Sequence, residues 1–363
     1  MEERKIRVAI TQGDVNGVGY EVILKTFADP TMFELCTPIV YGSPKIMSYH
    51  RKALDLPTAF SIINSAEDAA PGRLNVINCN DDEVKVELGT ASPEAGKAAL
   101  EALEKAVEDY RKGLFDVLVT APVNKNTIQS DTFHFNGHTE YFEERLGEGA
   151  KALMILAKDD LRVALVTTHE PICELPSLIT KERIQEKLTA FNQSLKMDFG
   201  ITAPRIAVLA LNPHAGDNGL IGTDEQNTIT PAIEQARSEG VLCYGPFSSD
   251  GFFGASSYQK FDGVLAMYHD QGLIPFKLLA MDEGVNYTAG LPIVRTSPDH
   301  GTAYDIAGKN VATEDSFRSA IYLAMDIYRQ RRHETAIRRN PLRKQFFDRR
   351  DDSDKLKLDN ADA

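Results

Sequence analysis

Short apolar runs recur along the chain and predict buried strands. The clearest are IRVAI at 6–10, FDVLVTA at 115–121, LRVALVTT at 161–168, RIAVLAL at 205–211 and FDGVLAM at 261–267. Continuous runs rich in β-branched residues suit strands that are covered on both faces, as in a parallel sheet. We therefore expect at least five strands inside a layered fold.

Longer amphipathic segments lie between these runs and predict helices. Segment 92–113 opens with Ser-Pro, a good N-cap and first-turn pair, and ends on a glycine. Segments 180–195 and 315–330 repeat apolar residues at the helical period, and Thr223 and Gln226 have capping-box spacing. The alternation of strands and helices predicts an α/β fold with a largely parallel sheet.

Length and composition narrow the class of protein. A chain of 363 residues is too long for one small core, which indicates two domains. The formal net charge of −13 argues against nucleic-acid binding, and no apolar run is long enough to span a bilayer. Four scattered cysteines and an N-terminus without an apolar signal region predict a cytoplasmic protein with free thiols.

Polar residues follow the predicted strands, and three of them are histidines. His169, His214 and His269 each lie at the end of an apolar run or within three residues of it. Because ligands bind beyond the carboxyl ends of strands in open α/β sheets, the three side chains could share one divalent metal with an open coordination position. Any one of them alone is more often a hydrogen-bonded cleft residue. Asp250 and Asp270 are the nearest loop carboxylates, and each is a candidate metal-supporting group, proton acceptor or solvated charge.

Other side chains are suited to an anion. His138 and Thr139 precede a predicted helix, and a helix N-terminus with such donors suits phosphate, although an ordinary N-cap would look the same. Lys277, Asn286 and Arg295 follow the last predicted strand and are suitable donors for phosphate and carboxylate. Individually, each is more often a surface residue.

The first loop, TQGDVNGVGYE at 11–21, is rich in glycine without being a known nucleotide motif. Its glycines lack the spacing of the Rossmann fingerprint, and it has no Lys-Ser/Thr element of a P-loop. Alone it predicts only a tight loop after the first strand.

Taken together, the loops resemble one family. ITQGDVNGVGYE, TAPVNK, FNGHTEYF, TTHEPICELP, LNPHAGDNGLIGTDE, VLAMYHDQGLIPFK and GVNYTAGLPIVRTSPDHGTAYDIAG occur in the order found in the 4-hydroxythreonine-4-phosphate dehydrogenases of pyridoxal phosphate biosynthesis. The resemblance extends from Ile6 to Gly308.

The resemblance implies a fold and an activity. The fold would be like that of isocitrate and isopropylmalate dehydrogenases, with two α/β/α domains around a cleft: 1–130 plus 275–337, and 131–274, followed by a charged tail at 338–363. The activity would be NAD-dependent and divalent-metal-dependent oxidation of the 3-hydroxyl of 4-phosphooxy-L-threonine, with decarboxylation to 3-amino-2-oxopropyl phosphate. Such enzymes are homodimers with the active site at the interface.

The resemblance also assigns roles to residues. It implies that the metal ligands are His169, His214 and His269, and that the substrate residues are His138, Thr139, Lys277, Asn286 and Arg295. It implies that the NAD loop is DHGTAYDIAGKN at 299–310, with His300, Gly301, Thr302 and Asp305 on the cofactor. The metal would be zinc, cobalt or magnesium, and the candidates for the catalytic base are Asp250, Asp270 and Lys277.

Some positions depart from the common pattern of the family. The departures are Gln12, Val15, Asn16, Tyr20 and Glu170. They leave every matched ligand in place but keep a paralogous activity open, on 4-phospho-threonate or 4-phospho-erythronate. A phosphotransacetylase-like acyltransferase and a non-catalytic metabolite sensor are more remote alternatives.

Overall fold

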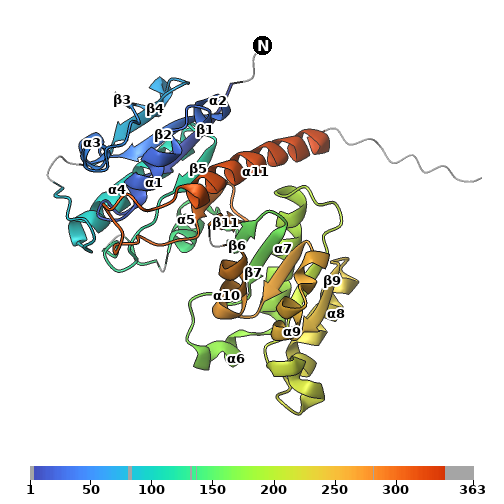
Figure 1. Cartoon of the computed structure of the whole chain (residues 1–363). Helices are drawn as coiled ribbons and strands as arrows, with labels where there is room; N and C mark the ends of the chain where they lie inside the picture. The colour runs from blue at the N-terminus through green and yellow to red at the C-terminus, as the bar shows by residue number, and fades with distance from the viewer. Residues whose placement is uncertain (1–3, 81–83, 131–132, 136, 281, 340–363) are drawn as a thin grey trace, which may run out of the picture.

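The computed structural model describes residues 4–80, 84–130, 133–135, 137–280 and 282–339. Figure 1 shows two lobes, one built mainly from the first part of the chain and one from its middle part, with the last helix running across the region between them. The expected α/β organisation is confirmed.

One twelve-stranded sheet runs through the described part of both lobes. In sheet order, the first half consists of β3 (Phe60–Ile63), β4 (Leu74–Asn78), β2 (Cys36–Gly42), β1 (Ile6–Thr11), β5 (Val117–Thr120) and β12 (Arg295–Pro298). The second half consists of β11 (Val285–Ala289), β6 (Leu153–Lys158), β7 (Leu161–Leu165), β10 (Gly263–Ala266), β8 (Ile206–Leu209) and β9 (Cys243–Phe247). All five strands expected from the apolar runs are present, as β1, β5, β7, β8 and β10.

The sheet is parallel except around its centre. Strand β6 pairs antiparallel with both β7 and β11, and β11 pairs antiparallel with β12. The β6–β7 connection is a hairpin in which Asp159 has a positive φ of 49°, a conformation that Asp tolerates better than most residues. The antiparallel strands join two parallel halves, and the apolar runs alone did not reveal them.

Helices cover the sheet on both sides. Their bounds are α1 (Gly19–Thr26), α2 (Met32–Leu35), α3 (Pro44–Ala53), α4 (Pro93–Arg111), α5 (His138–Leu146), α6 (Leu175–Leu178), α7 (Lys181–Met197), α8 (Thr230–Ser238), α9 (Ser249–Gly254), α10 (His269–Ala280) and α11 (Asp315–Arg339). The short helical turns are η1 (Ala66–Asp68), η2 (Ile172–Glu174), η3 (Pro213–Gly219), η4 (Glu225–Ile229) and η5 (Ser257–Lys260). The Ser-Pro start of α4 is confirmed, because Oγ of Ser92 accepts a hydrogen bond from the backbone N–H of Ala95.

Three local expectations need correction. The capping box at Thr223 does not form: the helical segment starts after Asp224 with a π-turn and no side-chain cap. The polar YHDQG segment is no open loop, since α10 begins at His269. The charged tail was expected from 338, but α11 continues through Arg339, so its first two residues are helical and the rest lie outside the described residues.

A buried polar cluster fastens α11 to the second lobe. Asp198 accepts hydrogen bonds from Ser194 Oγ (2.6 Å), Tyr287 Oη (2.7 Å) and Arg331 Nε (2.6 Å), so α7, β11 and α11 meet at one carboxylate. An ion pair whose carboxylate is 4% exposed is costly to break from one side, because the remaining charge stays buried. The cluster therefore stabilises the joint between the lobes on the face covered by α11.

The division into domains at 130 and 275 stays a prediction. Residue 275 lies inside α10, which packs on β7 and β10 of the second half. Helix α5 shares a hydrophobic core with α4 and β5 of the first half. Within the described residues, no helix is both long and apolar enough to cross a membrane.

Candidate active site

A cavity of about 280 Å³ lies between the lobes, where β5, β7, β10 and β12 end. All five expected substrate residues line it: His138, Thr139, Lys277, Asn286 and Arg295. Two expected metal ligands, His169 and His269, and two expected cofactor residues, His300 and Gly301, line it as well. Thr302 and Asp305 do not line it, and His214, Asp250 and Asp270 line a second cavity.

Arg295 forms the floor of the cavity and has no acidic partner among the described residues. Its side chain is buried at 2% exposure, and its guanidinium donates to Thr120 Oγ1 (3.1 Å from Nε) and Thr288 Oγ1 (3.1 Å from Nη1). Burial lowers the pKa of Arg295 to about 9, and Glu140 opposes this effect. A buried guanidinium whose hydrogen bonds within the described residues all go to hydroxyl groups is well suited to an incoming anion.

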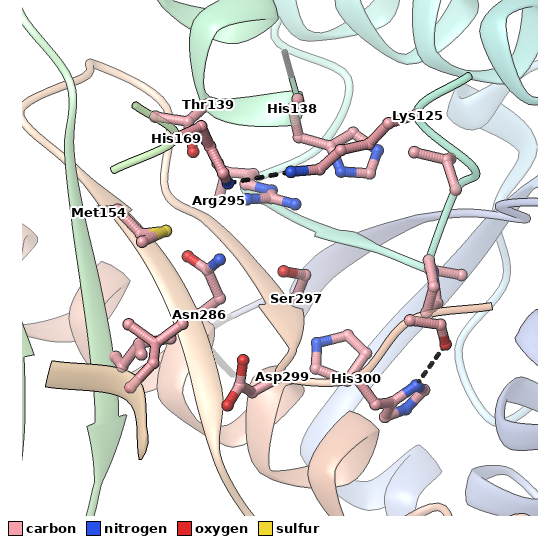
Figure 2. A pocket seen from close by; sticks show the side chains of 18 of the residues that line it. Lys125, His138, Thr139, Met154, His169, Asn286, Arg295, Ser297, Asp299 and His300 are labelled. Atoms are coloured by element: carbon pink, nitrogen blue, oxygen red, sulfur yellow. Dashed lines mark hydrogen bonds between the residues drawn. The ribbon is translucent and has the colours of Figure 1, made fainter. Parts of the chain in front are cut away.

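Helix α5 supplies the wall above Arg295 (Figure 2). His138, its first residue, stacks on Phe142 with ring centroids 6.3 Å apart, and its Nε2 is buried without a hydrogen-bond partner in the described part of the chain. Burial is the main reason that the pKa of His138 lies well below its usual value, with Arg295 and Lys125 adding to the effect. A neutral imidazole next to a helix N-terminus thus faces the same place as the buried guanidinium.

The opposite wall comes from β11, β12 and the loop after β12 (Figure 2). The Oδ1 atom of Asn286 and the Nε2 atom of His300 are buried, and neither has a partner among the described residues. Nδ1 of His300 donates to the carbonyl of Gly301 (2.9 Å), which leaves a lone pair on Nε2. Burial lowers the pKa of His300. Buried polar atoms are normally hydrogen-bonded, so these free atoms indicate a ligand.

Two of the three expected metal ligands face each other across the cavity. The rings of His169 and His269 are 5.8 Å apart between centroids. Nδ1 of His269 lies 2.8 Å from Oδ1 of Asp270, which is the supporting contact expected from the sequence and leaves Nε2 for a ligand. Nε2 of His169 accepts a hydrogen bond from Lys125 Nζ (3.0 Å).

His214 lies elsewhere in this chain. It is exposed and lines the second cavity together with Asp250 and Asp270. Among the described residues, no three His, Cys, Asp or Glu side chains converge on a common metal position. His169 and His269 carry donor atoms that a divalent metal could use, but Nε2 of His169 is taken by Lys125, so the three-histidine site stays a prediction.

The backbone around His214 has an unusual conformation. Residues 214–218 all have positive φ, between 44° and 76°, which costs about 1–2 kcal/mol for each residue other than glycine. The carboxylate of Glu225 stabilises the entry to this turn by accepting from the backbone N–H groups of Leu211 (2.9 Å) and Asn212 (2.7 Å). Such strain is typical of functional loops, and the Gly-Asp-Asn-Gly sequence is the signal that could have revealed it.

The glycine-rich first loop packs against the expected cofactor loop. A Cβ on Gly17 would lie 2.6 Å from the carbonyl oxygen of Thr302, and the backbone N–H of Val18 donates to that same oxygen (3.0 Å). Tyr304 Oη donates to Asp14 Oδ2 (2.6 Å). Because the two loops approach so closely, position 17 requires glycine. This contact explains why the first loop contains glycine although it lacks the spacing of a nucleotide-binding motif.

None of the departures from the family pattern lines the cavity, although Glu170 directly follows the cavity-lining His169. Those in the first loop are Gln12, Val15, Asn16 and Tyr20, and all are buried. Gln12 Oε1 accepts from Tyr20 Oη and from the backbone N–H of Ser43 (3.0 Å), while its Nε2 donates to Asn80 (2.7 Å). Glu170 pairs with Arg183 at 2.9 Å. The four first-loop residues are internal, whereas Glu170 has a buried Oε2 atom without a partner among the described residues and counteracts the lowering of the pKa of His169 by burial.

Sequence reasoning missed several lining residues. Lys125, Glu140, Ser297 and Asp299 all line the cavity. TAPVNK and SPDHG were recognised as family segments, and the position of Lys125 and Asp299 just beyond strands β5 and β12 was an available signal.

Comparisons with known proteins identify the family. Residues 34–324 match the family described as "Pyridoxal phosphate biosynthetic protein PdxA". The chain belongs to this family. A 4-hydroxythreonine-4-phosphate dehydrogenase of Bacteroides thetaiotaomicron is 68% identical over 362 residues, covering 100% of both chains. One from Sulfurihydrogenibium sp. is 42% identical, covering 90% of this chain and 100% of that relative.

A solved structure agrees with this assignment. The crystal structure of 4-hydroxythreonine-4-phosphate dehydrogenase from Klebsiella pneumoniae matches with a TM-score of 0.78 and 34% identity, over 90% of this chain and 99% of that one. The family expected from the loop motifs is therefore confirmed, together with its α/β fold.

Proposed function

We propose that this PdxA-family protein oxidises the 3-hydroxyl of 4-phosphooxy-L-threonine with NAD, and that the product decarboxylates to 3-amino-2-oxopropyl phosphate in pyridoxal 5'-phosphate biosynthesis. The main support for the proposal is Arg295, a buried cation whose hydrogen bonds within the described residues go to hydroxyl groups, in a cavity lined by all the expected substrate residues. Full-length identity of 68% to a relative named for this activity supports the same reaction.

The residues suit a small substrate with anionic ends. Arg295, His138 and Thr139 gather at the start of α5, while Lys277 and Asn286 come from α10 and β11. Cations at separate places on the wall would hold a phosphate and a carboxylate apart and fix the carbon between them. Such positioning contributes as much as about 7–11 kcal/mol to lowering a reaction barrier in favourable cases.

For the cofactor, we propose that NAD binds along the loop containing His300, Gly301, Thr302 and Asp305. The unpartnered Nε2 of His300 and the open space beside Gly301, where a Cβ would meet no atom within 4 Å, support this. A nicotinamide cofactor there would accept the hydride from the substrate carbon.

For the metal, we propose one divalent ion (zinc, cobalt or magnesium) held by His169, His214 and His269. When bound, it would supply a Lewis acid that stabilises negative charge on the substrate oxygen. Imidazole donors favour zinc or cobalt over magnesium. Of the base candidates Asp250, Asp270 and Lys277, only Lys277 lines the cavity with the substrate residues.

We also propose a homodimer with the active site at its interface. Helix α10 exposes Ile274 at 58% and Leu278 at 81%, one turn apart on the same face. Ile274 and Pro275 border the second cavity, which holds His214, Asp250 and Asp270. A second copy covering this face would bury the apolar stripe and close that cavity beside the catalytic one.

The free state of all four cysteines supports the proposed cytoplasmic location, because disulfides are rare in that reducing compartment.

An absorbance assay tests the proposed reaction. Purified protein with NAD, a divalent metal and 4-phosphooxy-L-threonine should form NADH, and the same mixture without substrate should not. Parallel reactions with 4-phospho-D-threonate and 4-phospho-D-erythronate test the paralogous activity. Turnover of either in preference to 4-phosphooxy-L-threonine would refute the proposed substrate, and no NADH with any of the three would refute the dehydrogenase assignment.

A further inference from the structure

Asp299 is the first residue after strand β12, lines the cavity, and has a backbone held by several hydrogen bonds. Its side chain is 13% exposed. Its backbone N–H donates to the carbonyl of Gly284 (3.1 Å) and to Oγ of Ser316 (3.1 Å), while Ser316 Oγ donates to the same carbonyl (2.6 Å). The end of β12, the turn before β11 and the first turn of α11 therefore hold Asp299 in one place.

Lys277 contacts this residue twice. Its Nζ lies 3.4 Å from Oδ1 of Asp299 and 3.3 Å from the main-chain oxygen of the same residue. A lysine side chain is long and flexible, and Lys277 is 45% exposed. Two acceptors on one rigid residue restrict its ammonium group to the wall of the cavity.

The contact joins the two halves of the sheet. Lys277 is on α10, which packs on β7 and β10, whereas Asp299 extends β12, which pairs with β5 and β11. Arg295 is positioned differently, by two threonine hydroxyls within the sheet. The separation between the ammonium group of Lys277 and the guanidinium of Arg295 thus depends on the Asp299–Lys277 contact.

We propose that Asp299 is a positioning residue for the substrate: it holds the ammonium group of Lys277 across the cavity at the place where an anionic group of the substrate binds. This inference rests on the proposed function, since it assigns Lys277 to the substrate. Asp299 acts through Lys277, so its contribution disappears when Lys277 is absent.

A double-mutant cycle tests this dependence. Asp299→Ala should raise the KM for 4-phosphooxy-L-threonine about tenfold, whereas the same change in a Lys277→Met background should alter KM less than twofold. Asp299→Asn retains an oxygen that accepts from the ammonium group, so its KM should stay within about threefold of the unchanged protein. Asp315→Asn changes a half-exposed carboxylate beside Ser316; it is the matched control and should leave both kcat and KM unchanged.

Two results would overturn the proposal. Additive effects of Asp299→Ala and Lys277→Met would mean that Asp299 acts independently of Lys277. A loss of kcat in Asp299→Asn equal to that in Asp299→Ala, with unchanged KM, would make Asp299 a proton-transfer group instead.

A binding measurement separates this proposal from the proposed function. Inorganic phosphate is titrated by calorimetry into the unchanged protein, Asp299→Ala, Lys277→Met and the double variant. This measurement needs no turnover. If the unchanged protein forms no NADH, the proposed function fails, yet non-additive losses of phosphate affinity would still support the positioning role. If the unchanged protein is active, and the effects of the two substitutions are additive both for KM and for phosphate affinity, only the positioning role fails.

Discussion

At the scale of single residues, burial makes the side chain of Arg295 suited to binding an anion. It lies at 2% exposure between Thr120 and Thr288 and lacks an acidic partner in the described part of the chain. Hydrogen bonds to charged groups contribute about 1.5–3 kcal/mol each. We therefore expect Arg295→Met to lower kcat/KM for the phosphorylated substrate by about 10- to 100-fold, measured by NADH formation.

Controls for Arg295 separate binding from folding. Arg295→Lys keeps a charge but loses the planar fork, so its kcat/KM should be intermediate. Thermal melting should show both variants folded at the assay temperature. A KM within twofold of the unchanged protein in Arg295→Met would contradict the anion-binding role.

The candidate site could be predicted from single residues only in part. His138, Lys277 and Arg295 were identified from family motifs, and the structure brings them to one cavity. Lys125 and Asp299 belong to segments that the family motifs include, but no local pattern gives either residue a partner; only the fold reveals that each lies beside another cavity-lining side chain. Conversely, Asp250 and His214 look like neighbours of the site in sequence order but line a separate cavity.

At the scale of elements, α3 contains a titratable group that makes folding depend on pH. His50 is 1% exposed, its Nε2 contacts the carbonyl of Val15 at 2.8 Å, and burial lowers its pKa from 6.5 to about 4. Between these pH values the unfolded chain binds more protons than the folded one, so stability is full above pH 6.5 and is lost as pH falls toward 4. The lowered pKa corresponds to a loss of about 3 kcal/mol in the free energy of unfolding when the pH falls below the pKa of the folded state.

Urea unfolding between pH 4 and pH 7.5 measures this effect. His50→Gln cannot acquire the proton, so its free energy of unfolding should fall less over this range than that of the unchanged protein, by up to about 3 kcal/mol. His333→Gln, which changes an exposed histidine late in α11, serves as the control and should retain the full pH dependence. Equal slopes for His50→Gln and the unchanged protein would contradict a role for the buried imidazole.

Elements with strong periodicity could be predicted, and those defined by tertiary contacts could not. The Ser-Pro start of α4 is local chemistry that the structure reproduces, and the apolar stripe expected over 180–195 forms the buried face of α7. The capping box expected from Thr223 and Gln226 does not form, because the helical segment starts one residue later, after Asp224, and opens with a π-turn. Lys158, Asp159 and Asp160 separate the apolar run of β6 from that of β7, and no local pattern shows that these two strands pair antiparallel.

At the scale of the whole molecule, alternating strands and helices predicted the fold class, and the join between the lobes came only from the structure. The buried cluster of Asp198, Tyr287 and Arg331 brings together residues up to 133 positions apart in the chain. No local pattern reports such a contact, because its favourable geometry exists only once α7, β11 and α11 have packed.

The exposed apolar face of α10 predicts how the molecule assembles. Leu278 is 81% exposed and does not line the cavity of the candidate substrate residues, so its apolar surface is open to contact with a second copy. If a second copy covers it, Leu278→Glu would bury an unpaired charge and should convert a dimer into monomers. Light scattering after gel filtration should detect this change at low micromolar protein concentration.

The matched control for Leu278 is Ile62→Glu, on edge strand β3 at the far side of the sheet, where Ile62 is 65% exposed. This variant should remain dimeric and active. Leu278→Glu should also lose activity, because the proposed site is completed at the interface, and the loss should grow as the protein is diluted. A Leu278→Glu protein that stays dimeric and fully active would mean that α10 lies outside the interface, and the second cavity beside it would then need another explanation.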